Sequence, residues 1–525
     1  MSARAFSSLR PVSCDRRPGT VRPSTVARSA WFRLVSAAAV SVAGFSGAAA
    51  QCPDGTPAPC AARPARVAAA QLPNSVAVLY LDNLSRDTAD AFLADGLTEE
   101  IIIRLTQVPR LDVKSRYEVQ RYRGQAAQDP AVLGRALRAA YLVTGSVQRA
   151  GDRVRLRYEV IRAASRAQVA GDVIDRTSSD LLTVESDIAR QVATAVTGQL
   201  LPEERARLSR PLTSDPAAYE EYLRGLQALN SSFEEGPLRA ALASFNRAIA
   251  RDPSFAAAFA GTALAWVWLA DAFVSPREGY GEARVAATRA LALDSTQTLA
   301  YAMLGVSVLA LDRNADEAER LARRAIALNP RADQAHLILY WALLAAGRLN
   351  EGVEEARRAW QADSLFSANG QNYAEALIYS RRLDSAAALM PRLRAILPSA
   401  DVDAVEGKLL AAKGDLRGAM NLVNWRYYGG LSAGTYVRAL LARGDTLSAR
   451  ATVDSMLAAR ASGYYNPVAL ARAYAALGDV SRGIEWFGRA IEERTQFLMY
   501  WRVDDELAPL RADPRFAALL RQLRY

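Results

Sequence analysis

The residues best suited to catalysis or metal binding are few in this chain of 525 residues. It contains one histidine, His336, and three cysteines, Cys14, Cys52 and Cys60. A Ser-His-Asp triad would have to use His336, which no nucleophile motif accompanies, and metallohydrolases usually need two or more imidazole ligands. The sequence also lacks a phosphate-binding glycine loop, a kinase catalytic loop and a zinc-binding motif. It therefore predicts a protein without catalytic residues, metal ligands or a cofactor, in which His336 packs in the core.

An acidic cluster near the start of the first folded segment has two interpretations. Its members are Asp82, Asp87, Asp95, Glu99 and Glu100. Carboxylates grouped in this way could bind a cation. Alternatively, Asp82 marks the turn after a strand, and the acidic residues that follow favour the dipole at the start of a helix. The second interpretation is favoured, and ligand binding stays the alternative.

The net charge of +10 is concentrated at the N-terminus. Residues 1–50 hold seven arginines and one acidic residue, Asp15, which leaves only +4 for the rest of the chain. A surface that binds phosphate groups needs a concentrated basic face. The sequence therefore predicts no nucleic-acid partner.

The N-terminal 50 residues have the pattern of an export signal. Basic residues precede an uncharged segment, 34–50, which is rich in Ala, Val and Ser and ends in small residues before Gln51. This order is typical of a secretory signal peptide. An uncleaved anchor in the inner membrane is the alternative interpretation. We expect an exported protein, periplasmic or otherwise extracytoplasmic.

Export would place the cysteine pair in an oxidising compartment. Cys52 and Cys60 bracket a turn-rich loop within the Pro/Ala-rich segment 51–72. A small local disulfide is the natural expectation there. A metal site is the less favoured alternative, because no histidine stands nearby. The segment is expected to act as a linker or tether.

Residues 73–205 combine strand and helix patterns in the order βαβαβββα. Strands are expected over residues 76–80, 111–114, 141–148, 153–161 and 167–174, and helices over residues 90–106, 129–138 and 180–200, the last with Asp180 as its N-cap. Alternating apolar residues in the strand 153–161 predict one buried face. The pattern indicates an α+β domain with helices packed against a mixed sheet.

Five segments of this domain carry a family resemblance. They are Ser75–Leu79, Leu81–Asp87, Leu93–Glu100, Tyr141–Val147 and Gly151–Arg155. Together they resemble the TolB-N-terminal/FlgO-like α/β domain, which commonly precedes tetratricopeptide repeats. Such pairs often form the sensory or accessory half of bacterial transcription regulators, class III adenylate cyclases and Ser/Thr kinases. The resemblance implies no catalytic residues. Because only residues 1–33 precede the apolar segment, an effector domain is not expected.

Residues 215–525 are predicted to be helices joined by short turns. Four apolar helices are each followed by a glycine, at Gly347, Gly414, Gly444 and Gly478. The last two glycines are 34 residues apart and the first two are 67 apart, close to two such periods. This period is that of the tetratricopeptide repeat (TPR). The sequence predicts an all-α TPR superhelical solenoid of about eight units with a C-terminal cap.

Three side chains fall at positions that face the concave groove in this repeat family. They are Trp268, Leu337 and Trp341. An apolar concave surface suits an extended or helical peptide. We therefore expect a non-catalytic, exported scaffold for protein–protein interaction in the bacterial cell envelope. The alternative is a sensory or regulatory protein whose α/β domain binds a small ligand and signals through the repeats.

Overall fold

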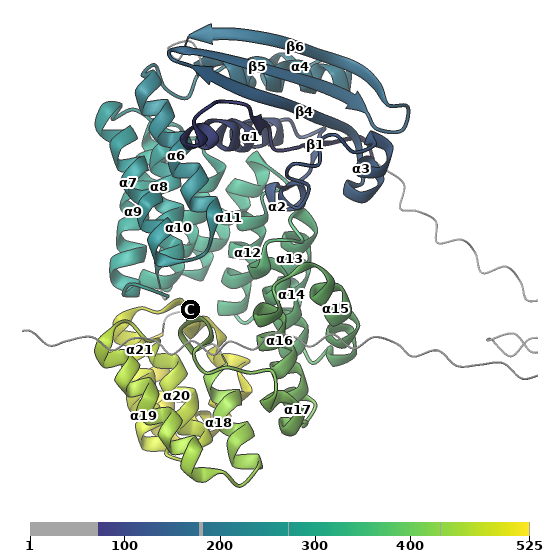
Figure 1. Cartoon of the computed structure of the whole chain (residues 1–525). Helices are drawn as coiled ribbons and strands as arrows, with labels where there is room; N and C mark the ends of the chain where they lie inside the picture. The colour runs from purple at the N-terminus through teal and green to yellow at the C-terminus, as the bar shows by residue number, and fades with distance from the viewer. Residues whose placement is uncertain (1–71, 178–181, 271, 431, 524–525) are drawn as a thin grey trace, which may run out of the picture. The chain divides into compact units, whose positions relative to one another are not determined.

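The computed structural model describes residues 72–177, 182–270, 272–430 and 432–523 (Figure 1). The predicted signal peptide or anchor, the linker with Cys52 and Cys60, and the predicted N-cap Asp180 lie outside the described residues. Within the described ranges, no helix has both the length and the apolar character needed to cross a membrane.

The N-terminal domain is built on the mixed sheet that the sequence predicted. Its strands are β1 (Leu72–Val78), β2 (Asp82–Asn83), β3 (Asp112–Val113), β4 (Ala139–Ala150), β5 (Arg153–Arg162) and β6 (Ala167–Thr177). The order across the sheet is β3-β1-β4-β5-β6, with β2 also paired to β4. The pairs of β1 with β3 and with β4 are parallel, whereas β4–β5 and β5–β6 are antiparallel. The expected α+β class is confirmed.

The helices of this domain are short except for two. They are α1 (Ala91–Thr106), α2 (Arg116–Gln120), α3 (Pro130–Leu137), α4 (Val184–Thr197) and α5 (Pro202–Leu208). Asp129 caps α3 by accepting a hydrogen bond from the amide of Ala131, and Pro130 takes the first helical position, where its missing N–H costs nothing. Helices α2 and α5 were not predicted from the sequence, because their five and seven residues are too few to show a helical period.

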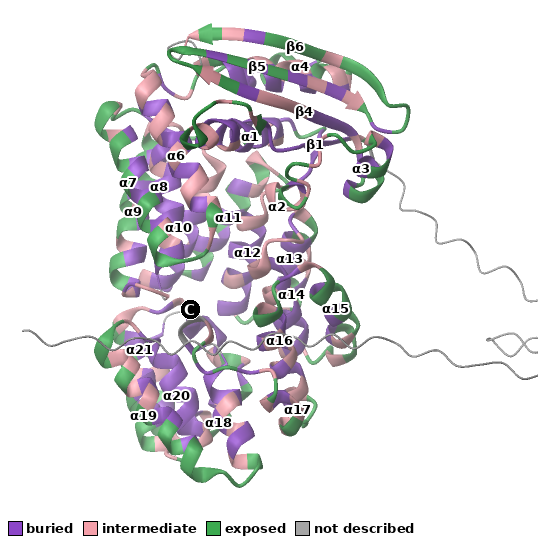
Figure 2. Cartoon of the chain, viewed as in Figure 1, coloured by how far each residue is buried: buried purple, intermediate pink, exposed green. Residues whose placement is uncertain are grey.

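Burial differs between the strands of the sheet: residues 75–78 of β1 are all buried, β6 is mostly exposed, and β5 alternates between buried and more exposed residues (Figure 2). Along β5, the side chains of Val154, Leu156, Tyr158 and Val160 are buried, and the arginines between them are exposed. This is the alternation that the sequence predicted, because successive residues of a strand point to opposite faces. Helices α1 and α4 contact the sheet and each other and share one core with its buried face.

The rest of the described chain is a solenoid of helical pairs. Within the described ranges the eight consecutive pairs are α6 (Pro216–Ser231) with α7 (Glu235–Arg251), α8 (Ala256–Leu269) with α9 (Pro276–Leu293), α10 (Thr298–Leu311) with α11 (Ala315–Leu328), α12 (Asp333–Ala345) with α13 (Leu349–Ala362), α14 (Ser367–Tyr379) with α15 (Leu383–Ile396), α16 (Ser399–Ala412) with α17 (Leu416–Met420), α18 (Ala433–Ala442) with α19 (Thr446–Ser462), and α20 (Pro467–Ala476) with α21 (Val480–Glu493). First helices of neighbouring pairs, such as α8, α10 and α12, contact one another. The all-α TPR-type solenoid is the predicted fold.

The glycines that revealed the period have a defined backbone role. Gly347, Gly414, Gly444 and Gly478 follow the ends of α12, α16, α18 and α20, and their φ angles are +80°, +90°, +78° and +80°. A residue in the left-handed backbone conformation turns the chain sharply after a helix. Glycine adopts this conformation without a steric penalty, because it has no Cβ. The repeat is therefore visible in the sequence where the backbone needs that turn.

After α21 the chain continues as a C-terminal segment, residues 494–523, made of short helices. They are the 3-10 helices η4 (Gln496–Arg502) and η5 (Asp505–Leu507), then α22 (Ala508–Arg511) and α23 (Pro514–Leu520). Phe487 of α21 and Phe516 of α23 pack with ring centroids 4.6 Å apart, which anchors the end of the segment to the last repeat.

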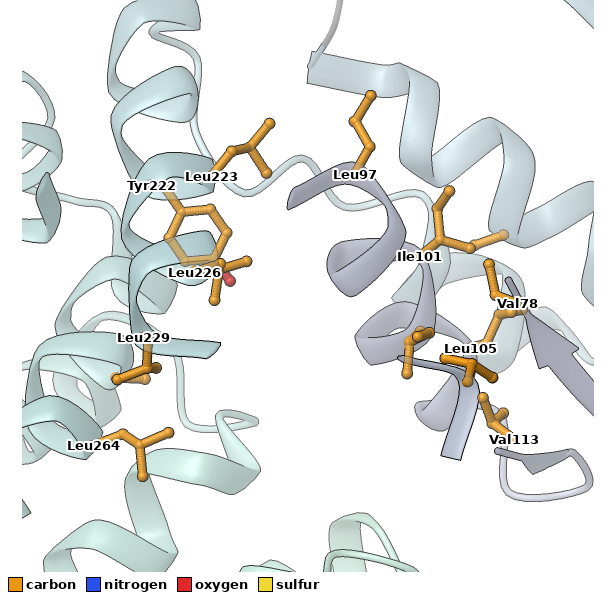
Figure 3. Packing of buried hydrophobic residues seen from close by; sticks show 14 of the residues in the cluster. Val78, Leu97, Ile101, Leu105, Val113, Tyr222, Leu223, Leu226, Leu229 and Leu264 are labelled. Atoms are coloured by element: carbon orange, nitrogen blue, oxygen red, sulfur yellow. The ribbon is translucent and has the colours of Figure 1, made fainter. Parts of the chain in front are cut away.

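The N-terminal domain from β1 to α5, called the sheet domain below, shares one hydrophobic core with the first repeats. The cluster runs without a break from the strands through α1 to α6 and onward to α12. Figure 3 shows Leu97, Ile101 and Leu105 of α1 on one side, and Tyr222, Leu223 and Leu226 of α6 on the other. The repeats therefore use part of the sheet domain to bury their first apolar face, since a solenoid needs a cap at each end.

Candidate functional site

A cavity of about 630 Å³ lies between the sheet domain and the repeats. Its walls come from α1, β3 and α2 on one side and from α6, α8, α10 and the start of α12 on the other. Ile102, Leu226, Leu264 and Leu299 contribute an apolar surface. A cavity of this volume, mostly apolar with a few polar groups, is of the size that encloses a small organic molecule.

The polar end of the cavity is formed by α2. There the Arg116 guanidinium donates a hydrogen bond to the hydroxyl of Tyr117 (2.7 Å). It also lies 5.9 Å from the ring centre of Trp268 on α8, within cation–π range. The ring of Tyr117 stacks on Phe366 at 5.3 Å between centroids. An arginine between aromatic rings is thus presented to the cavity from the sheet domain.

Two carboxylates from the repeats also line this cavity. Asp363 accepts hydrogen bonds from the backbone amides of Leu365 and Phe366, both at 3.1 Å. Asp333 accepts one from Asn369 at 3.1 Å. Burial, together with the nearby carboxylate of Asp333, raises the pKa of Asp363 to about 8. Asp363 is therefore largely protonated at neutral pH.

The acidic cluster predicted from the sequence does not gather at one point. Asp87 caps the 3-10 helix η1 (Thr88–Asp90) by accepting a hydrogen bond from the amide of Ala89, and Asp95 pairs with Arg123 at 2.6 Å. Asp82 is exposed in the short strand β2. Among the described residues, no group of three or more His, Cys, Asp or Glu side chains could hold a metal ion. The favoured interpretation, which assigns structural roles to these residues, fits Asp87.

For Glu99 and Glu100 that interpretation was wrong in one respect. Both lie in the middle of α1 rather than in its first turn, and both are buried. Glu99 accepts a hydrogen bond from the hydroxyl of Tyr80. Burial raises the pKa of both glutamates above the ordinary value. The signal was available in the sequence, since two acidic residues interrupt an otherwise apolar helical run.

Glu100 belongs to a buried polar network that joins three elements. Arg104, also on α1, contacts Glu100 and Glu185 of α4, each at 3.1 Å. Tyr222 of α6 donates a hydrogen bond from its hydroxyl to Glu100 at 3.2 Å. Arg104 also donates to the backbone carbonyl of Leu208, at 3.0 Å. One guanidinium thus serves two buried carboxylates and fixes the sheet domain to the first repeat.

Two of the three predicted groove residues are covered by the chain itself. Leu337 is only 2% exposed and packs in the core between repeats. Trp268 is 8% exposed, and its ring packs against Phe366 and Phe233 at 5.9 Å in each case. Both side chains are thus largely covered in this structure, and a partner groove at these two positions stays a prediction, because the repeat register does not reveal what the α/β domain and the neighbouring loops cover.

Trp341 is partly buried and lies next to the C-terminal segment. Its indole N–H donates to the side-chain oxygen of Asn372 at 2.8 Å. The hydroxyl of Tyr500, on η4, donates to the same oxygen at 3.1 Å. The predicted groove position at Trp341 thus has an intramolecular neighbour, a short segment from the C-terminus.

Further hydrogen bonds hold the end of the chain against the third helical pair. Arg313, between α10 and α11, donates to the backbone carbonyls of Gln522 (2.9 Å) and Ile491. Arg494 donates to the carbonyl of Leu311 at 2.8 Å. The partners are separated by between 178 and 209 positions in the sequence. The contacts therefore connect the C-terminal part of the chain to the third helical pair of the array.

His336 is buried, with both ring nitrogens engaged. Nδ1 lies 2.7 Å from a carboxylate oxygen of Glu355, and Nε2 lies 3.0 Å from the carbonyl oxygen of Pro330. Neither nitrogen is left to activate a nucleophile. This is the packed histidine that the sequence predicted.

The comparisons with known proteins cover parts of the chain. The sequence matches no known protein-family model. It is 31% identical over 190 residues to a Rhizobium meliloti (strain 1021) protein named "Putative adenylate cyclase 3". The match covers 36% of this chain and spans about a third of that protein (32%).

Several solved structures are similar to part of this chain. One is a thermophilic TPR protein of Thermus thermophilus (20% identity, TM-score 0.32, 38% of this chain and 99% of that chain). Another is PilW, a type IV pilus biogenesis factor (16%, 0.33, 40% and 91%). A third is YrrB, a TPR protein with an unusual peptide-binding site (20%, 0.25, 40% and 91%). At these TM-scores the likeness carries no conclusion about function.

Proposed function

We propose that this chain is a non-catalytic scaffold that binds another protein through its repeats. The observation that carries the proposal is the intramolecular contact at Trp341, where Asn372 accepts hydrogen bonds from both Trp341 and Tyr500. A repeat surface that accommodates a short segment of its own chain has the polar and aromatic groups that peptide recognition requires. The partner would bind at Trp341, in place of η4 or beside it.

Site-specific photo-crosslinking in the native host tests this function. A photoreactive phenylalanine at position 341 is expected to link the chain to a second protein. The matched control is position 285 on α9, where Val285 is 67% exposed and distant in sequence from η4. Adducts at position 341 confined to this chain's own C-terminal segment would contradict the scaffold function.

We also propose that the protein is exported to the cell envelope. The support is the basic N-terminus followed by the uncharged segment 34–50 and the small residues before Gln51. N-terminal sequencing and thiol alkylation of protein from fractionated cells test this. A chain that starts at Gln51 with Cys52 and Cys60 protected from alkylation is the expected result. A full-length membrane-bound chain would identify an anchor, and free thiols in the cytosolic fraction would contradict export.

A second candidate function is a sensory protein that binds a small ligand. The cavity between the sheet domain and the repeats favours it, because a ligand there would touch both parts of the molecule. A ligand that binds only the folded state must raise its stability. The two functions are compatible, since a ligand at α2 could alter the repeats that bind the partner.

A further inference from the structure

The charged residues around the cavity are not balanced. Six basic side chains and five acidic ones line it, namely Arg104, Lys114, Arg116, Arg207, Arg210 and Arg331 against Glu99, Glu100, Asp294, Asp333 and Asp363. Burial raises the pKa of Glu99, Glu100 and Asp363 above the ordinary value of a carboxyl group. The lining thus holds one basic side chain more than acidic ones, and what it offers an anion depends on which basic groups have carboxylate partners.

Most of the basic groups already have carboxylate partners. Lys114 lies 2.8 Å from Asp112, and Arg331 pairs with the other oxygen of that carboxylate. Arg210 lies 3.2 Å from Asp294. Each of these basic groups therefore already has a carboxylate within ion-pair distance, although Lys114 and Arg331 share the same one.

Arg116 differs from them. Among the described residues, no carboxylate lies within ion-pair distance of its guanidinium, and its hydrogen-bond partner is the neutral hydroxyl of Tyr117. Glu99 and Asp363 both interact electrostatically with Arg116 from beyond ion-pair distance. Glu99 accepts its hydrogen bond from Tyr80, and Asp363 accepts from the backbone amides of Leu365 and Phe366. Because Arg116 is half-buried and has no adjacent carboxylate, an anion from solution could reach its guanidinium and would gain a charge-assisted hydrogen bond there.

The surroundings of Arg116 define the rest of the ligand. Trp268 and Tyr117 give aromatic surfaces beside the guanidinium, at 5.9 and 4.5 Å from the ring centres. Beyond them, Leu226 and Leu264 line the cavity from α6 and α8. A ligand that satisfies both regions has one negatively charged group and an apolar body.

We propose that the cavity binds a small organic monocarboxylate, with its carboxylate on the Arg116 guanidinium and its apolar body against Trp268, Leu226 and Leu264. A carboxylate suits the planar guanidinium, which can donate two parallel hydrogen bonds to it. The ligand would touch α2 of the sheet domain and α8 of the repeats together, and would strengthen the contact between them. This inference rests on the second candidate function and deepens it, and it is independent of the scaffold function.

Matched pairs of probes test the charge requirement. The purified full chain is titrated calorimetrically with octanoate and octanol, with phenylacetate and 2-phenylethanol, and with inorganic phosphate. At least one carboxylate is expected to bind about 10-fold or more tightly than its alcohol, since a charge-assisted hydrogen bond contributes that much. Equal binding of acid and alcohol, or binding of phosphate without either carboxylate, would overturn the proposal. So would the absence of binding by both carboxylates.

Two variants and a control test the location. Arg116→Gln is expected to weaken carboxylate binding about 10-fold to 100-fold while leaving alcohol binding unchanged. Arg121→Gln, on an exposed arginine just beyond α2 and outside the cavity lining, is expected to bind as the unaltered chain does. Ala257→Phe, at a partly exposed lining position, is expected to weaken binding of the acid and of the alcohol together.

These outcomes separate the ligand site from the scaffold. Circular dichroism checks that the Arg116→Gln variant is folded. If the folded variant binds the carboxylate as tightly as the unaltered chain does, the site lies elsewhere and the proposal is overturned. Loss of the crosslinked partner at position 341 with carboxylate binding intact would instead contradict only the scaffold function. Because the two readouts use different elements of the fold, one can fail without the other.

Discussion

A Cβ built on Gly96 of α1 would lie 2.6 Å from the Cβ of Leu223 on α6. The two helices therefore cross at this point with no room for a side chain, and their contact joins the sheet domain to the first repeat (Figure 3). Glycine in the middle of a helix ordinarily costs about 0.5–1 kcal/mol relative to alanine. At position 96 glycine is nevertheless favoured, because α1 and α6 approach each other too closely to admit a Cβ.

Gly96→Ala is expected to destabilise the fold by about 1–3 kcal/mol, because backbone and side chains must shift to admit the methyl group. Chemical denaturation monitored by circular dichroism measures this. The control is Gly281→Ala in α9, where a Cβ would meet no atom within 4 Å. That change should be neutral or stabilise by up to about 1 kcal/mol. Stabilisation by Gly96→Ala would show that the helices can move apart.

Stability should fall as the pH rises through the neutral range. Burial, only partly opposed by Arg104, raises the pKa of Glu185 from 4.5 to about 8. Between these values the folded state holds a proton that the unfolded state has released, so raising the pH favours unfolding. The fall stops above about pH 8, where both states are deprotonated.

Glu185→Gln should remove this contribution while preserving the shape of the side chain. The variant is expected to gain stability relative to the unaltered chain from about pH 5 to about pH 8, by at most about 1.4 kcal/mol per pH unit. Thermal unfolding at several pH values measures the difference. A difference that does not change with pH would mean that Glu185 is ionised throughout, paired with Arg104.

Replacing Arg104, the cation shared by Glu100 and Glu185, should strongly lower the free energy of unfolding. Arg104→Met would leave Glu100 and Glu185 buried without it, at a cost of about 3–5 kcal/mol at neutral pH. The loss should be smaller at about pH 5, where protonation of Glu100 is also favoured, as that of Glu185 already is below about pH 8 in the folded state. A control is Arg239→Met, which breaks only the exposed pair with Glu235 and should cost at most about 1 kcal/mol. Equal costs for the two variants would argue against a buried network.

The closure of the array by the C-terminal segment can be tested at Arg313. Arg313→Met removes the donors to the carbonyls of Ile491 and Gln522. Hydrogen exchange should then increase at the amides of residues 490–523 and stay unchanged in β4 and β5, because local opening needs less free energy than global unfolding. Arg320→Met, which removes an exposed pair with Glu317, should leave that exchange unaltered. Faster exchange over the whole chain would indicate general destabilisation instead.

The sequence by itself determined the elements and the repeat. Alternation along β5 and the left-handed glycines after α12, α16, α18 and α20 are local requirements of a strand and of a helix end, so each is recorded in a short stretch of residues. The packed state of His336 could likewise be predicted from its place in the repeat.

Only the tertiary structure decided which surfaces stay open. Arg116 and Trp268 are far apart in the sequence, yet they line one cavity, and Tyr500 lies beside Asn372 near Trp341. No local pattern encodes such contacts, because burial depends on which distant element covers a side chain. For that reason neither the burial of Trp268 and Leu337 nor the cavity at Arg116 was predicted from the sequence.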